Sequence, residues 1–289
     1  MKISLASHAA ELAVGSSDFA VVGTALKEAG FEAIDFSLCD YGRPMEWLAT
    51  EDAFRTIVRD MEAVKAAGLE IGQCHLPYVP SNTPHSFEEY MSILRPLYKN
   101  GLRICGAVGC PVAVIHLHFE DDAEKTFEAN VSLIRELMPL LYENNVTLAI
   151  ENIYAGGSKY LDSHVTRAED MMRYVDTFHD PHVALCLDVG HAIISRNDPI
   201  DMVYRFGRHL VATHIHSTGR HDNHTIPGTN PKWLDPVDYD ALSKALGDIG
   251  YTGTYNLEVG FCYALPAAGK PFLQLAAVVA RHYADRTGV

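Results

Sequence analysis

Features that mark several protein classes are missing from this chain of 289 residues. No run of about 18 apolar residues occurs, which argues against a membrane-spanning helix. The apolar stretch in the opening MKISLAS is too short for a signal peptide. Six cysteines are scattered without a CxxC pair, so neither a thiolate zinc site nor a disulfide framework is indicated. We therefore expect a soluble, cytoplasmic protein with reduced cysteines and no membrane partner.

Basic residues are scarce as well, with 23 lysines and arginines against 37 aspartates and glutamates, and the formal net charge is −14. This balance argues against non-specific binding of nucleic acid, because such binding depends on basic side chains that neutralise phosphates. No GxGxxG follows the first β-rich run, and no P-loop occurs. A dinucleotide or nucleoside triphosphate site is therefore not indicated.

Short β-rich runs do alternate with helix-like segments at intervals of about 36 residues, as expected of βα units. The eight runs are KISLAS, EAIDFS, LEIGQCH, VAVIHLH, VTLAIEN, VALCLDVG, LVATHIHS and TYNLEV. Helices are expected at 16–30, 51–68, 86–108, 121–144, 163–178, 198–208, 236–248 and 270–285. The first two close on Gly30 and Gly68, which is typical of helices that lead directly into strands.

Eight parallel strands joined by helices close most simply into a (β/α)8 TIM barrel, an α/β fold whose active site lies at the carboxyl ends of the strands. The length and the hydrophobic content of 48% suit one such domain over residues 1–289. A doubly wound open sheet is the alternative, and the missing glycine-rich motif disfavours it.

Four hydrophobic runs in the second half of the chain end in an acidic residue or a histidine. They are TLAIEN with Glu151, ALCLDVGH with Asp188, LVATHIH with His214 and TYNLEVG with Glu258. A carboxylate at the end of a strand buried on both faces needs a polar partner or a cation, so four such endings suggest one shared site. Mixed carboxylate and imidazole ligands favour Zn²⁺, Mn²⁺, Co²⁺ or Fe²⁺ over Ca²⁺.

Five further residues at the same rim are candidates for additional metal ligands. They are His75, His116, His191, Asp222 and His224. One such histidine alone is more often a packed or solvated residue, but nine potential ligands at one rim have no common structural reason to gather there. We therefore predict a divalent metal cofactor and allow for more than one ion per chain.

The histidines of the HIH segment need separate treatment. His214 and His216 lie two residues apart on one run, so both side chains point to the same side of the strand. Only one of them is needed as a ligand of the central ion.

These residues and their order resemble the xylose-isomerase-like TIM-barrel superfamily, which includes sugar and sugar-phosphate isomerases and epimerases as well as the endonuclease IV branch. The likeness covers essentially the whole chain. The family's metal-binding set is matched in its local motifs by Glu151 in EN, Asp188 in DxxH, His214 in HxH and Glu258 in LEV.

The resemblance also implies substrate contacts. Arg220, six residues after His214, falls where tagatose-3-epimerase-like members carry an arginine near the substrate. This spacing supports His214 over His216 as the metal ligand. His191, His216 and Arg220 are then expected to contact the substrate.

Other residues are similar to the endonuclease IV branch. The five additional candidates look like the further ligands of its trinuclear zinc site, and ENIYAGGS is similar to one of its loops, although the same residues recur in many members closer to sugar isomerases. The chain departs from the family pattern at HIHST, which lacks the acidic residue usual three positions after the histidine, and at IPGTN, which stands in place of GEG. The first departure leaves in doubt one hydrogen bond that would orient a metal ligand, and the second the usual loop geometry.

The leading interpretation is a metal-dependent isomerase or epimerase of a sugar or sugar phosphate, which moves a proton next to a carbonyl through an enediolate. The resemblance implies that Glu151 and Glu258 flank the substrate and divide the removal and the return of that proton. The alternative is an endonuclease IV-like phosphoesterase acting on abasic DNA, which the net charge disfavours. A third interpretation is an inactive barrel that serves as a binding subunit, and nine potential ligands argue against it. We expect a carbohydrate ligand, and a homo-oligomer is compatible with the sequence.

Overall fold

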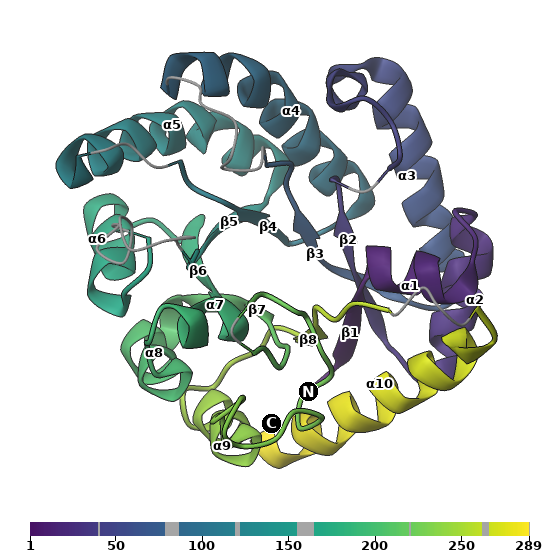
Figure 1. Ribbon diagram of the computed structural model, residues 1–289. Helices are drawn as coiled ribbons and strands as arrows, with labels where there is room; N and C mark the ends of the chain where they lie inside the picture. The colour runs from purple at the N-terminus through teal and green to yellow at the C-terminus, as the bar shows by residue number, and fades with distance from the viewer. Residues whose placement is uncertain are drawn as a thin grey trace.

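The computed structural model describes residues 1–39, 41–78, 87–118, 122–154, 165–219, 221–261 and 266–288. Within them, eight parallel strands form one sheet at the centre of the molecule (Figure 1). The strands are β1 (Ile3–Ala6), β2 (Ala33–Ser37), β3 (Glu70–His75), β4 (Val112–Ile115), β5 (Thr147–Glu151), β6 (Val183–Asp188), β7 (Leu210–His214) and β8 (Tyr255–Leu257). Each strand lies within one of the eight predicted runs, so the predicted α/β fold is confirmed.

The sheet closes on itself as a TIM barrel. Neighbouring strands follow the order β7-β6-β5-β4-β3-β2-β1-β8, and a parallel bridge between Ile215 and Leu257 joins the two ends of that order. The amide of Ile215 donates to the carbonyl oxygen of Asn256 (2.9 Å), and the amide of Glu258 donates to that of Ile215 (3.2 Å). Closure thus places the ends of β7 and β8 side by side.

Helices surround the barrel on its outer side (Figure 1). The α-helices of the described residues are α1 (Ser7–Val14), α2 (Phe19–Ala29), α3 (Glu51–Ala66), α4 (Phe87–Val108), α5 (Ala123–Asn144), α6 (Ala168–Phe178), α7 (Val189–Ile194), α8 (Pro199–Phe206), α9 (Tyr239–Asp248) and α10 (Gly269–Ala284). Short 3-10 helices are η1 (Met45–Ala49), η2 (Gly207–His209), η3 (Pro266–Ala268) and η4 (Asp285–Thr287). Eight of the α-helices coincide with predicted ones, whereas α1 and α7 are not anticipated by the sequence pattern.

Local side-chain chemistry sets several helix ends. The carboxylate of Asp18 accepts from the amide of Ala20 at the start of α2, which ends at Gly30 with a φ of 108° in the left-handed region. The hydroxyl of Thr50 accepts from the amide of Ala53 at the start of α3. Each of these groups satisfies a backbone amide that the first turn of a helix leaves unpaired.

Apolar side chains pack both inside and outside the barrel. The larger core lies between the strands and the helices, and a smaller one fills the barrel interior with Val112, Val114, Ala149, Cys186 and Ala212. Alternate residues of a strand face the same side, so the next inward positions on β5, β6 and β7 are Glu151, Asp188 and His214. Along β5, β6 and β7, the apolar inward-facing residues are therefore followed by a polar layer at the carboxyl ends of the strands.

Within the described part of the chain, no single helix is long and apolar enough to cross a membrane. Helices α1 and α2 reach that length and composition only when they are taken together, across a bend of 95°.

Candidate metal centre

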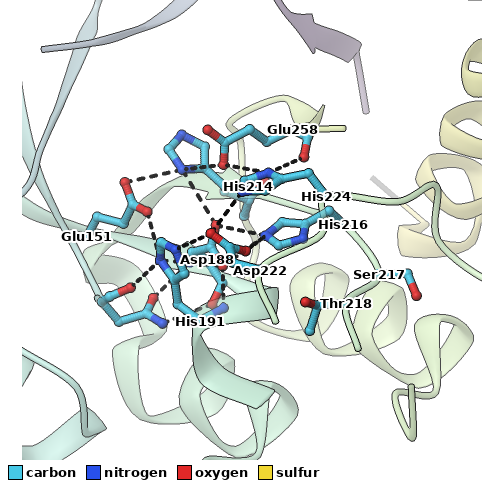
Figure 2. Close-up of polar contacts among 12 residues, drawn as sticks. Glu151, Asp188, His191, His214, His216, Ser217, Thr218, Asp222, His224 and Glu258 are labelled. Atoms are coloured by element: carbon cyan, nitrogen blue, oxygen red, sulfur yellow. Dashed lines mark hydrogen bonds and ion pairs between the residues drawn. The ribbon is translucent and has the colours of Figure 1, made fainter. Parts of the chain in front are cut away.

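Strand register brings the predicted ligands to one mouth of the barrel. Asp188 is paired with His214 across β6 and β7, because the register shifts by one residue between Leu185 and Cys186. Without that shift, Asp188 would pair with a residue whose side chain faces the other way. Figure 2 shows the carboxylate and imidazole side chains pointing toward one another from several strands and loops.

The centre of the group is His214, which is fully buried. Its Nδ1 atom lies 3.2 Å from Glu151 Oε2, 3.3 Å from Glu258 Oε2 and 3.9 Å from Asp188 Oδ2. The four residues predicted to share one ion therefore converge within a few ångströms (Figure 2).

A second set of donors adjoins Glu151. His116 Nε2 lies 3.1 Å and His75 Nε2 lies 3.3 Å from Glu151 Oε2. The two imidazole nitrogens are themselves 3.1 Å apart. These three residues form a compact group. The other oxygen of Glu151, Oε1, lies 3.1 Å from His191 Nδ1.

A third set gathers around Asp222, in the segment between β7 and α9. Asp222 Oδ2 lies 3.0 Å from His224 Nε2 and 3.3 Å from His191 Nε2. The other nitrogen of His224 contacts the carbonyl oxygen of Glu258 at 2.8 Å. All five residues predicted as additional ligands therefore lie in direct contact with the group around His214 or with one another.

His216 is also brought into the centre, against Asp188. Its Nε2 atom lies 3.1 Å and 3.2 Å from the two oxygens of Asp188, and the side chain is fully buried. Its ring stacks on that of His224, with centroids 4.1 Å apart. Ser217 and Thr218, which follow His216, lie apart from this cluster (Figure 2).

Asn152 ties two of the strand ends together. Its side-chain amide donates to the carbonyl oxygen of Asp188 (2.9 Å) and accepts from the amide of Asp188 (2.8 Å). The carboxylate of Asp188 in turn accepts from the amide of His191 (2.6 Å) and caps α7. One side chain therefore fixes the spacing of β5 and β6 beside the ligands.

A buried network that the sequence analysis missed anchors the segment carrying Asp222. Asp235 accepts a hydrogen bond from Ser217. The single hydroxyl hydrogen of Tyr239 is shared between Asp235 (2.9 Å) and the carbonyl oxygen of His216 (3.0 Å). Asn230 donates to Ser217 (3.0 Å). The only sign of this network in the sequence is a set of polar residues in the segment 217–235, which is expected to be irregular.

The sequence analysis also does not identify Asp35, which lies inside strand β2. Arg220, one of the three predicted substrate contacts, lies outside the described residues.

Three carboxylates of the centre, those of Glu151, Glu258 and Asp222, are held in their ionised form. Burial opposes ionisation of Glu151, but His214 and His116 outweigh it and keep its pKa well below the usual value. Burial likewise opposes ionisation of Glu258, and His214 with His224 lowers its pKa. The pKa of Asp222 is lowered against burial by hydrogen bonds with imidazoles. Several negative charges are thus concentrated in one buried place.

The imidazoles respond in the opposite direction. Burial disfavours protonation of His191 and His214, but the neighbouring carboxylates raise the pKa of both well above the usual value. The pKa of His224 is raised to about 9 by Asp222, again against burial. Burial prevails only at His116 among these rings and lowers its pKa. Positive charge is therefore drawn to this site, as protons or as cations.

The donor set fits divalent metal ions. Bonds of about 2.0–2.2 Å place neighbouring ligand atoms roughly 3–3.5 Å apart, which is the spacing found around His214 Nδ1. That nitrogen, although buried, has no hydrogen bond of acceptable geometry within the described residues, and neither has Asp222 Oδ1. A cation would satisfy both atoms.

The sequence matches the model of a known protein family. A sequence model of the family described as Xylose isomerase-like TIM barrel matches residues 23–262. A protein of Sinorhizobium fredii (strain NBRC 101917 / NGR234), named Uncharacterized protein y4fM, is 29% identical over 171 residues, or 56% of this chain and 51% of that protein. The chain spans about half the length of this curated relative.

Solved structures share the fold at low sequence identity. The 3-keto-D-glucoside 4-epimerase YcjR from E. coli has a TM-score of 0.71 at 16% identity, over 92% of this chain and 95% of that chain. D-psicose 3-epimerase from Clostridium cellulolyticum H10 has a TM-score of 0.71 at 15% identity, over 99% and 98%. Mannonate dehydratase from Streptococcus suis serotype 2 has a TM-score of 0.71 at 18% identity, over 99% and 93%.

The raised imidazole pKa values predict that metal binding releases protons. At neutral pH, adding Zn²⁺ to the metal-free protein should displace protons from His191, His214 and His224, because an ion needs the imidazole lone pair. The affinity should fall as the pH is lowered, since protons then compete more strongly. Calorimetric titration in two buffers of different ionisation enthalpy measures the release, and a binding heat that is the same in both would contradict it.

A glycine beside His216 gives a second prediction. A Cβ atom on Gly190 would lie 2.0 Å from His216 Cε1 and 2.5 Å from Nε2, so Gly190→Ala should push the ring away from Asp188. Gly190 has no left-handed φ, so the backbone tolerates alanine. We expect metal affinity to fall about 10-fold or more, as for other residues that orient ligands, measured by Co²⁺ titration.

The matched control is Gly260→Ala, two residues after Glu258. Its Cβ would lie 3.7 Å from the nearest atom, the carbonyl oxygen of His224, which is an ordinary contact. This variant should bind Co²⁺ as the wild type does. Equal affinity of Gly190→Ala and the wild type would show that the His216 ring does not support the centre.

Proposed function

Because this chain belongs to the Xylose isomerase-like TIM barrel family, we propose that it is a divalent-metal-dependent isomerase or epimerase of a sugar or sugar phosphate, acting as one domain over residues 1–289. The observation that carries the proposal is the convergence of Glu151, Asp188, His214 and Glu258 at the barrel mouth. This is the end of a TIM barrel at which substrates bind.

The names of structurally similar proteins support a carbohydrate substrate. Two are epimerases, of a 3-keto-D-glucoside and of D-psicose, and one is a dehydratase of mannonate. Epimerisation inverts a carbon that bears a hydrogen, and that hydrogen becomes acidic when a carbonyl group is adjacent. An enzyme for such a reaction needs a base on one side of the carbon and an acid on the other.

In this proposal Glu151, Asp188, His214 and Glu258 hold one ion. His75 and His116 with Glu151 form one group that would hold a further ion. Asp222 and His224 form a second such group with His216, and His191 contacts it through Asp222. A bound divalent ion supplies Lewis acidity, which stabilises negative charge developing on the substrate's oxygens. Glu151, Glu258 and Asp222, whose pKa values are all lowered, carry more negative charge than one divalent ion neutralises, which argues for more than one ion per chain.

Glu151 and Glu258 are the proposed acid and base. They approach His214 Nδ1 from β5 and from the end of β8, at nearly equal distances. Their lowered pKa values keep both groups ionised in the metal-free protein, which is the form in which a carboxylate can act as a base. One carboxylate takes the proton from the carbon next to the carbonyl and becomes a carboxylic acid. In isomerisation, the same group returns the proton to the neighbouring carbon. In epimerisation, the other glutamate, protonated from solvent, delivers a proton to the opposite face, and the first glutamate releases its proton to solvent. No oxidant or reductant is consumed.

The predicted substrate contacts have different surroundings. Both nitrogens of His191 contact protein groups, and His216 is fully buried against Asp188. We propose that both hold carboxylates in place, and their contact with substrate stays a prediction. The contact of Arg220 with substrate also stays a prediction.

A second candidate function rests on the number of donor groups. Three adjoining sets of carboxylates and imidazoles suit a phosphoesterase that acts on abasic DNA, in which several ions activate water and stabilise a leaving oxygen. The net charge of −14 disfavours a DNA groove. The sugar reaction is therefore the main proposal.

Exchange of substrate hydrogen with solvent tests the acid and base roles. Incubated in D₂O with Mn²⁺, Co²⁺ or Zn²⁺, the wild type should place deuterium on a carbon next to the carbonyl of a ketose or ketose phosphate from a panel that includes D-psicose and D-tagatose. Glu151→Gln and Glu258→Gln should lower that rate at least about 100-fold, because proton transfer by a placed side chain contributes this much. Mass spectrometry or NMR measures the incorporation.

The control is Glu143→Gln, which changes an exposed glutamate on α5 and should exchange at the wild-type rate. Metal content of each variant is measured in parallel, since loss of the ion must be separated from loss of the base. Wild-type exchange rates in both site variants would contradict the roles. Chelator-sensitive cleavage of an abasic-site oligonucleotide, with no exchange on any sugar, would favour the second candidate.

A further inference from the structure

One carboxylate lies deeper in the barrel than the proposed ligands. Asp35, in the middle of β2, is 2% exposed. Its Oδ2 atom accepts hydrogen bonds from the side-chain amides of Gln73 (3.0 Å) and Asn256 (2.8 Å). Its Oδ1 atom is buried, and no hydrogen bond to it occurs within the described residues. Asp35 is thus a buried acidic group held in place by neutral amide side chains inside the barrel.

Two neutral amides do not compensate a buried carboxylate fully. Taking such a charge out of water is costly unless a charged or strongly polarised partner meets it. Within the described part of the chain, the ionisable partner of Asp35 is His214, whose Nε2 atom lies 3.5 Å from Asp35 Oδ2. This is an ion-pair distance, and in the metal-free arrangement Nε2 makes no hydrogen bond of acceptable geometry within the described residues. Asp35 therefore faces the imidazole that stands at the centre of the metal site.

The two nitrogens of His214 have different neighbours. Nε2 faces Asp35, whereas Nδ1 faces Glu151 and Glu258 at 3.2 Å and 3.3 Å. A carboxylate can only accept a hydrogen bond, so it favours a proton on Nε2. A neutral imidazole with its proton on Nε2 has a free lone pair on Nδ1, on the side of the two glutamates.

We propose that Asp35 is a positioning residue of the metal centre: it holds the proton of His214 on Nε2 and so presents Nδ1 to the cation. This inference rests on the metal centre proposed above. The hydrogen bonds from Gln73 and Asn256, which come from β3 and β8, keep the Asp35 carboxylate at the required place. Carboxylates that accept from metal-bound imidazoles orient the ring and raise its basicity.

The variant Asp35→Asn tests the charge with little change of shape. Its amide oxygen can replace Oδ2 as the acceptor for Gln73 and Asn256, so the barrel should still fold, which circular dichroism and the Tm of the metal-free protein check. Zn²⁺ or Co²⁺ affinity, measured by competition with a chromophoric chelator and without any sugar, should fall about 10-fold to 100-fold.

The matched control is Ser4→Ala, in the same buried network. The Ser4 hydroxyl donates to Asn256 Oδ1 (2.8 Å), and its oxygen lies 2.7 Å from the hydroxyl oxygen of Thr254. No contact of Ser4 with His214 is found in the described residues. This variant disturbs the network but leaves the charge of Asp35, so its metal affinity should match the wild type. Equal affinities of Asp35→Asn and the wild type would overturn the proposal, and so would an equal loss in both variants.

A second measurement needs no variant. In the Zn²⁺-loaded wild type with ¹⁵N-labelled histidine, long-range ¹H–¹⁵N spectra should show His214 protonated on Nε2 and metal-bound through Nδ1. The reverse arrangement would overturn the role of Asp35 while leaving the metal site intact. A wild type that binds no divalent ion at all would instead remove the metal centre itself, so the two failures can be told apart.

Discussion

The chemistry of the candidate metal centre depends on the electrostatic cost of burying several carboxylates together. Glu151 and Asp188 are 1% and 0% exposed at the end of an apolar barrel, and Glu258 and Asp222 adjoin them. Imidazoles offset part of that cost, as their raised pKa values indicate. Protons and divalent cations are the two kinds of positive charge that such a place attracts, and they exclude one another on the same nitrogen. The proposed metal dependence follows from this competition.

The fold supplies the arrangement through strand alternation and one register shift. Ala149, Cys186 and Ala212 fill the barrel interior. The proposed ligands Glu151, Asp188 and His214 stand two residues further along the same strands. The shift between Leu185 and Cys186 then sets Asp188 beside His214. Below that layer, Asp35 faces the rear nitrogen of His214. The site is therefore built on strands, with its outermost donors on the segment that Asp235 anchors.

The barrel and the polar strand ends could be predicted from the sequence, because both are indicated by residues close together in the chain. An apolar run closed by Glu151 or Asp188 is visible without knowing its neighbours, and so is a helix that closes on Gly30. The contacts of Asp35 with Gln73, Asn256 and His214 join four strands, and no spacing in the chain reveals them. The partner of His216 is similarly hidden, because a one-residue register shift decides which side chain it meets. Helix α7 was missed since its first residue follows directly on a strand and its cap is Asp188, a residue read as a ligand.

The most direct test of the account is a crystal structure of the protein loaded with Mn²⁺ or Zn²⁺, with anomalous diffraction recorded at the metal's absorption edge. The account predicts an anomalous peak within bonding distance of Glu151, Asp188, His214 and Glu258, with His214 bound through Nδ1. A loaded crystal with no peak at this mouth of the barrel, or with the ion held by other residues, would contradict it.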